Sequence, residues 1–262
     1  MTAPINARVV APAVMGLLML ALWEAAVRAF KIPPYILPGP LVVAETLVDD
    51  WGTLWPSLLV TLRITLEALV AAVVVGGALA LLFSLSRWIE LSLLPYAIIL
   101  QVTPIVAIAP LIIIWANNVE LSLLICAWLV AFFPILSNTI VGLRSVDANL
   151  LDLFRLYGAG RWRTLVDLRL PAALPYFLAG LRISGGLALI GAVVAEFVAG
   201  TGGNASGLAW RILEAGYQLQ IPRMFAALAL VSASGIAIYL ALNLASHLLL
   251  RRWHESALAP DA

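Results

Sequence analysis

The chain has 262 residues, of which 63% are hydrophobic and only 11% are charged, and its formal net charge is +1. Because soluble domains carry about 25% charged residues, this composition excludes an ordinary water-facing globule and favours the bilayer as a second solvent. The chain has no basic face that would indicate nucleic acid, and its single cysteine, Cys126, excludes an intrachain disulfide and a cysteine-based metal cluster.

Six apolar stretches are long enough to cross a membrane as helices, since a span needs about 20 mostly apolar residues. In chain order they cover residues 9–30, 57–85, 91–115, 121–143, 172–198 and 224–250. We therefore predict an all-α integral membrane protein with about six transmembrane helices in a single domain, residues 1–262. Pro95, Pro104 and Pro110 predict kinks in the third span, and Pro134 predicts one in the fourth.

The first span and two of the connecting segments have further features that predict their structure. The first stretch is long for a signal peptide and has no clear cleavage site, so we interpret it as a retained span. Lys31–Pro40 has four prolines and should be extended, and Leu41–Trp55 should form a short interfacial helix. Gly200–Arg223 should form a glycine-rich bend followed by a short surface helix.

The basic residues predict the orientation in the membrane. With the N-terminus in the cytoplasm, the outside segments contain Lys31, Arg211 and Arg223. The inside segments then contain a larger set: Arg8, Arg87, Arg144, Arg155, Arg161, Arg163, Arg169, Arg251 and Arg252. Because cytoplasmic loops are enriched in Lys and Arg, both termini and residues 144–171, here called the polar segment, should be cytoplasmic.

The polar segment can form two short helices. Residues 152–157 suit the first, which Gly158 can end, and Arg161–Leu168 suit the second, with Pro171 terminating the segment before the next span. Trp162, Leu165 and Val166 fall near one face of the second helix. Such a helix fits a groove on a partner, although a solvated loop helix that only anchors the topology would look the same.

The spacing in this segment resembles the cytoplasmic loop of bacterial ABC importer permeases of the binding-protein-dependent type. That family's signature is Glu-Ala-Ala, three residues, Gly, nine residues, then Ile-x-Leu-Pro. Here the same frame reads Asp152-Leu153-Phe154, then Gly158, then Leu168-Arg169-Leu170-Pro171. An acidic residue is retained at the first position, whereas Leu-Phe replaces Ala-Ala.

The resemblance extends over nearly the whole chain. The matching stretches are Leu37–Pro40, Gln101–Pro104, Ala109–Leu111, Phe132–Pro134, Asn138–Thr139, Gly142–Asp147, Leu170–Pro175, Ala179–Arg182 and Val194–Glu196. Within the family the chain is most similar to the nitrate/sulfonate/taurine branch and to the branch for pyrimidine, thiamine-precursor and riboflavin uptake. Trp115-Ala116-Asn117-Asn118 departs from the sulfonate branch, which usually has Trp-Phe-Gly, and this favours a heterocycle over a sulfonate.

The resemblance implies a type I ABC importer permease architecture in the bacterial inner membrane. It also implies two ABC ATPase subunits, a second permease copy, expected to form a homodimer, and an extracytoplasmic substrate-binding protein. The chain has no Gly-x-x-x-x-Gly-Lys-Ser/Thr loop, so we expect no enzymatic activity and no cofactor on it, with ATP and Mg bound by the ATPase. The residues expected to couple to the ATPase are Asp152, Leu153, Phe154, Gly158, Arg161, Trp162, Leu165, Leu168, Leu170 and Pro171.

Polar residues within the spans are candidates for the substrate pathway, and they are Gln101, Thr103, Asn138, Thr139, Glu67 and Glu196. A charge at mid-bilayer costs roughly 2.5–3.5 kcal/mol, so Glu67 and Glu196 either line the pathway or are structural. Arg63 lies four residues before Glu67, which predicts an ion pair on one helical face. The substrate expected is a small organic solute or oxyanion: a pyrimidine, a riboflavin-like compound, nitrate, sulfonate or taurine.

Three other classes of membrane protein remain as alternatives. A membrane-embedded enzyme would need a cluster of catalytic groups or metal ligands, and the chain has only two histidines and no evident triad. A secondary transporter often has two related halves, which are not evident in this sequence. A non-transporting membrane subunit could use the polar segment for docking alone.

Overall fold

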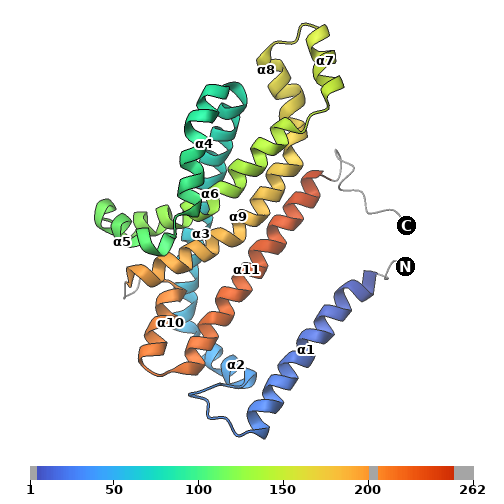
Figure 1. Cartoon of the computed structure of the whole chain (residues 1–262). Helices are drawn as coiled ribbons and strands as arrows, with labels where there is room; N and C mark the ends of the chain where they lie inside the picture. The colour runs from blue at the N-terminus through green and yellow to red at the C-terminus, as the bar shows by residue number, and fades with distance from the viewer. Residues whose placement is uncertain (1–4, 201–205, 251–262) are drawn as a thin grey trace. The chain divides into compact units, whose positions relative to one another are not determined.

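The computed structural model describes residues 5–200 and 206–250, and all regular secondary structure in them is helical (Figure 1). Within this part, five helices are long and apolar enough to cross a membrane, and one bent pair would make a sixth span. The prediction of an all-α membrane protein with about six spans is therefore confirmed. The orientation of the termini stays a prediction, and three of the arginines behind it, Arg251, Arg252 and the side chain of Arg8, lie outside the described residues.

The helices follow the predicted stretches closely. Their bounds are α1 Ile5–Ala29, α2 Pro40–Asp49, α3 Trp51–Leu85, α4 Arg87–Val102, α5 Ile105–Ala116, α6 Val119–Arg144, α7 Ala148–Leu156, α8 Arg161–Thr164, α9 Leu170–Ala199, α10 Leu208–Tyr217 and α11 Ile221–Leu250. A π-helical turn, Leu165–Arg169, joins α8 to α9. The described residues divide into two compact units, 5–60 with 206–233 and 61–200 with 234–250.

The third predicted span is broken rather than kinked. Its two parts, α4 and α5, meet at an angle of 105°. Thr103, with ψ 123°, and Pro104, with ψ 116°, both have extended backbone at the break. Because proline lacks an N–H and disfavours helical geometry in the residue before it, the chain leaves the helix at this pair. Pro95 and Pro110 lie within α4 and α5 without breaking them.

In the second unit, α6 and α9 pack against each other at very close range. A Cβ added at Gly180 would lie 2.7 Å from the carbonyl oxygen of Pro134, and one at Gly142 would lie 2.8 Å from the Cα of Ala173. Ser184 in α9 donates a hydrogen bond of 2.6 Å to the carbonyl oxygen of Ala131 in α6. Small residues let membrane helices approach closely, so this pair forms the rigid centre of the unit.

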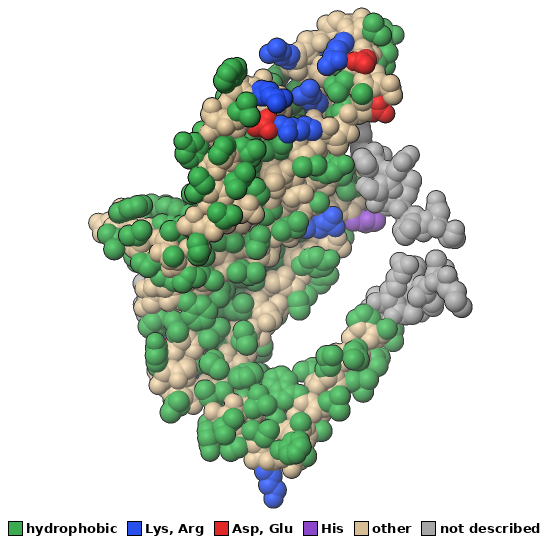
Figure 2. Space-filling model, in the orientation of Figure 1, with side chains coloured by type: hydrophobic (Ala, Val, Ile, Leu, Met, Phe, Trp, Pro, Cys, Tyr) green, Lys and Arg blue, Asp and Glu red, His purple; other side chains and the backbone are tan. Residues whose placement is uncertain are grey.

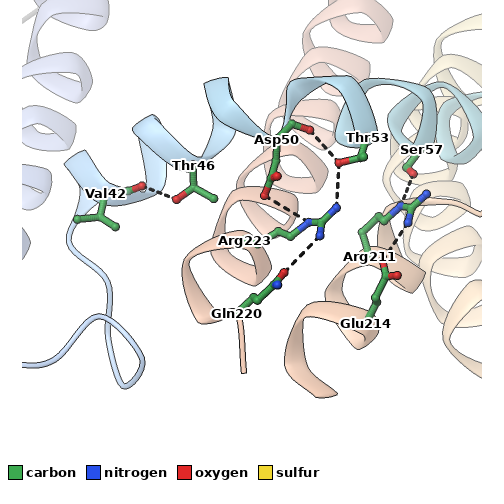
Figure 3. A network of polar contacts seen from close by, with 9 residues as sticks. All are labelled: Val42, Thr46, Asp50, Thr53, Ser57, Arg211, Glu214, Gln220 and Arg223. Atoms are coloured by element: carbon green, nitrogen blue, oxygen red, sulfur yellow. Dashed lines mark hydrogen bonds and ion pairs between the residues drawn. The ribbon is translucent and has the colours of Figure 1, made fainter. Parts of the chain in front are cut away.

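In the first unit, two arginines from α10 and α11 form hydrogen bonds with the start of α3 (Figure 3). Arg223 at the start of α11 donates to Thr53 Oγ1 at 2.9 Å and lies 3.3 Å from Asp50 Oδ2. Arg211 in α10 donates to Ser57 Oγ at 2.9 Å and pairs with Glu214. These contacts hold α10 and the start of α11 against the first turns of α3.

The connections around this network differ in part from the prediction. An interfacial helix over Leu41–Trp55 is wrong at its end, because α2 stops at Asp49 and α3 begins at Trp51. Trp51 and Trp55 belong to the first turns of α3, where their rings stack with centroids 5.2 Å apart. The predicted surface helix is present as α10, whereas residues 201–205 of the glycine-rich bend lie outside the described residues.

Candidate functional site

The polar segment folds as a helical hairpin of α7 and α8 that extends beyond the ends of α6 and α9 (Figure 1). Its first helix begins earlier than predicted, at Ala148, because the Asp147 carboxylate accepts a hydrogen bond from the Asn149 N–H at 2.7 Å and caps it. Asp152, in the middle of this helix, is exposed and pairs with Arg155 at 2.8 Å.

Gly158 ends α7 as predicted, in the left-handed conformation with φ +67°. Its N–H donates to the Arg155 carbonyl at 3.0 Å, and the Ala159 N–H donates to the Phe154 carbonyl at 2.9 Å. This pair of bonds is the Schellman arrangement, which satisfies carbonyls at a helix end. A Cβ added at Gly158 would meet no atom within 4 Å, so the backbone conformation alone favours glycine here.

The second helix is continuous with a span, which the sequence did not predict. Pro171 was expected to terminate the segment, but it lies in the first turn of α9, where proline is tolerated. In a regular α-helix its ring would clash with the Asp167 carbonyl. The π-helical turn avoids that geometry, with the Leu170 N–H donating to the Leu165 carbonyl. Arg161–Ala199 is therefore one 39-residue helical body.

The predicted apolar face of the second helix is split. Leu165 is only 3% exposed and belongs to the buried core of the second unit, whereas Trp162 is 69% exposed. Sequence reasoning missed two side chains at the end of α7, Leu156 and Tyr157, which are 84% and 83% exposed. Apolar side chains in a polar loop would have been the signal. Together with Trp162 they give the hairpin an exposed apolar tip.

The other predicted coupling residues are distributed along the hairpin. Leu153 and Phe154 line a cavity of about 320 Å³ together with Tyr157, Arg163 and Asp167. The remaining positions are the exposed Arg161, Leu170 and Pro171 and the half-buried Leu168. Most of the predicted coupling residues are therefore exposed to solvent, whereas Leu165 is buried.

Two of the pathway candidates line one cavity. Gln101 and Thr103, at the end of α4, border a cavity of about 350 Å³ that Pro134 and Leu187 also line. The Thr103 hydroxyl donates to the Ile99 carbonyl of its own helix at 2.7 Å. Asn138 and Thr139 likewise donate to the carbonyl oxygens of Pro134 at 2.8 Å and Ile135 at 2.6 Å. The break between α4 and α5 thus places the Gln101 amide beside a cavity that is otherwise mostly apolar.

The two acidic candidates have different surroundings. Glu67 forms the predicted ion pair with Arg63, at 2.8 Å, and Arg63 also lies 3.7 Å from Glu120. Glu196 is only 3% exposed and accepts a hydrogen bond of 2.8 Å from the Thr61 hydroxyl, across 135 residues of chain. Among the residues that the structure describes, no cluster of His, Cys, Asp and Glu could hold a metal ion.

Comparison with known proteins gives the family. Residues 72–255 match the family described as binding-protein-dependent transport system inner membrane component. A probable ABC transporter permease protein of Haemophilus influenzae is 34% identical over 240 residues, which cover 92% of this chain and 96% of the relative. The riboflavin transport system permease protein RibX of Chloroflexus aurantiacus is 36% identical over 242 residues, covering 92% of this chain and 88% of the relative.

A third relative is the formylaminopyrimidine transport permease protein ThiX of Halalkalibacterium halodurans, 31% identical over 240 residues that cover 91% of this chain and 94% of the relative. The predicted resemblance to ABC importer permeases is thereby confirmed. The chain therefore belongs to the family of binding-protein-dependent transport system inner membrane components. Its apolar helices agree with this, and it is a multi-pass permease subunit of an ABC transporter in the bacterial inner membrane.

Proposed function

We propose that this permease subunit forms half of an import pathway, paired with a second copy of itself and driven by ATP that separate ATPase subunits hydrolyse. An extracytoplasmic binding protein delivers the substrate, in keeping with the family's description as binding-protein-dependent. ATP and Mg bind to the ATPase, and this chain supplies the pathway and the mechanical connection.

The observation that carries this proposal is the exposed tip of the hairpin. Leu156, Tyr157 and Trp162 are each more than two-thirds exposed at the end of a segment surrounded by charged residues. Burying one large apolar side chain contributes about 1.5–3 kcal/mol, so three of them provide a strong contact for a groove on a partner. Asp152, Gly158 and Arg161 then set the shape and charge of the docked surface.

Continuity of the helix supports the transmission of force from this contact. Arg161–Ala199 spans 39 residues, which corresponds to a rod of about 58 Å at the rise of an α-helix. The rod packs along α6 at glycine contacts that leave little room for sliding. Movement of the hairpin by an ATPase would therefore move α9 and α6 together, as alternating access by rigid bodies requires.

We propose a small heterocyclic substrate, which the names of the riboflavin and formylaminopyrimidine relatives support. Asn117 and Asn118 do not favour one substrate class over another. Asn117 adopts the left-handed conformation, φ 49°, that ends α5, and the Asn118 side chain accepts a hydrogen bond from the Leu121 N–H at 3.1 Å and caps α6. These two residues are accounted for by the turn between the helices.

Reconstitution tests the proposal. The chain, its ATPase and its binding protein are placed in proteoliposomes, and ATP-dependent uptake of labelled riboflavin, formylaminopyrimidine and taurine is measured. Leu156→Asp should abolish both ATPase co-purification and uptake, while Leu41→Asp, at an exposed leucine of α2, should leave co-purification intact. Retention of the ATPase by Leu156→Asp would contradict the docking model, and uptake of taurine alone would contradict the substrate class.

A further inference from the structure

A basic cavity lies at the end of the second unit from which the hairpin extends. Its volume is about 540 Å³, and it opens between the turn that joins α3 to α4 and the hairpin. Four arginines line it, Arg87, Arg155, Arg161 and Arg169, and no carboxylate does. Figure 2 shows arginine side chains gathered over the ends of α4, α7 and α8.

Most of this positive charge lacks a partner among the residues that the structure describes. Arg155 pairs with Asp152, and the neighbouring Arg144 pairs with Glu90. Arg87, Arg161 and Arg169 form no ion pair and no side-chain hydrogen bond with any residue in the described part of the chain. Like charges gathered around one cavity repel each other, so an anion bound there would relieve this repulsion.

The chemistry of the lining matches a phosphate group. Guanidinium groups bind phosphate oxygens with two parallel N–H bonds, and four of them line this cavity. The rim is apolar on the side of the spans: Trp88 is 82% exposed and Leu85 is 40% exposed. An indole at the end of a span is typical of the lipid headgroup level, and basic pockets between membrane helices bind acidic headgroups.

We propose that this cavity binds a phosphate-bearing anion, and that its source is the headgroup of an acidic phospholipid. The bound phosphate bridges Arg87 at the start of α4 to Arg161 in the hairpin and to Arg169 at the end of the π-helical turn. It thereby ties the base of the hairpin to the α3–α4 turn, so that the charge of the membrane influences how firmly the hairpin is held. Arg161 also belongs to the surface proposed to dock the ATPase, so lipid binding is tested on the chain without the ATPase.

The test uses the full chain alone, purified in neutral detergent. Native mass spectrometry counts the phosphatidylglycerol and phosphatidylcholine that it retains from mixed micelles, with inorganic phosphate added in a separate arm. Wild type should retain phosphatidylglycerol preferentially, and Arg87→Gln with Arg169→Gln should bind it about tenfold or more weakly. Arg161→Gln alone should weaken binding about fivefold. Because Arg161 is exposed, this single variant still tests the site if the double variant fails to fold.

Arg163→Gln is the matched control, because Arg163 lies in the same hairpin but pairs with Asp167 and does not line this cavity. It should retain the lipid as wild type does. Displacement of the lipid by millimolar inorganic phosphate would identify a soluble phosphate as the source and overturn the lipid assignment. Equal retention of phosphatidylcholine, or equal binding by wild type and the double variant, would overturn the site itself.

Discussion

At the scale of single residues, the contact between Thr61 and Glu196 joins α3 to α9 through one hydrogen bond of 2.8 Å. Thr61→Val keeps the shape of the side chain and removes the donor, so the buried Glu196 loses one partner. We expect the free energy of unfolding to fall by about 1 kcal/mol, measured by thermal unfolding in detergent.

Thr65→Val is the matched control for this contact. Thr65 is also fully buried in α3, but its hydroxyl donates only to the Thr61 carbonyl of its own helix, at 2.7 Å. Its loss should therefore cost less than that of Thr61. Equal losses for the two variants would show that the bond to Glu196 adds nothing to stability.

Gly158 is the residue on which the shape of the hairpin depends. At φ +67° a β-branched side chain is strained by roughly 1–2 kcal/mol, although no neighbouring atom obstructs it. Gly158→Val should therefore reduce uptake per ATP hydrolysed while leaving membrane insertion intact, and Gly158→Asn should restore coupling because asparagine tolerates this conformation. Uptake and ATP hydrolysis in proteoliposomes measure both effects.

Gly160 provides the control at the next glycine. Its φ is −67°, which any residue adopts, and a Cβ there would also meet no atom within 4 Å. Gly160→Ala should couple normally. Normal coupling in Gly158→Val as well would mean that the end of α7 does not set the geometry of docking.

At the scale of elements, the π-helical turn sets the rotation of α8 relative to α9. Pro171→Ala restores an N–H that the Asp167 carbonyl can accept from, and the turn should relax to an α-helix. That change rotates α8 by on the order of 100°, the rotation per residue of an α-helix, and turns Trp162 away from its present direction. Spin-label distances between residue 162 and α6 should shift, and ATPase co-purification should fall.

Pro175→Ala is the comparison for that prediction, since Pro175 lies within α9 but beyond the π-helical turn. It should leave the direction of Trp162 unchanged. Unchanged distances in Pro171→Ala would indicate that packing of Leu165, rather than the proline, maintains the turn.

The arginine contacts at the start of α3 allow a prediction for the first unit. Arg223→Leu removes the donors to Thr53 and Gln220 and leaves Asp50 without its cation, which should cost about 2 kcal/mol of unfolding free energy. Arg28→Leu breaks the pair between the exposed Arg28 side chain and Glu24 and should cost much less, because solvent screens this arginine. Thermal unfolding compares them, and a cost for Arg28 as large as that for Arg223 would contradict this account.

At the scale of the whole molecule, hydropathy predicted the long helices because an apolar run of span length has few alternatives in a bilayer. Local spacing also predicted the Arg63–Glu67 pair and the helix end at Gly158. The bond between Thr61 and Glu196 could not be predicted, since the two residues are 135 positions apart. Pro171 misled the prediction because a proline in the first turn of a helix and a proline that ends one look alike in sequence.

The orientation of the molecule in the membrane is the prediction on which the docking model depends. Cys126 is the only cysteine and is buried, so Cys126→Ser gives a background without thiols. In that background, Arg163→Cys should react with a membrane-impermeant maleimide only after the cells are opened, because excess arginine favours the cytoplasm. Lys31→Cys, in the connection between α1 and α2, should react in intact spheroplasts. If Arg163→Cys were labelled from outside, the hairpin would lie across the bilayer from ATP, and no ATPase could reach its exposed tip.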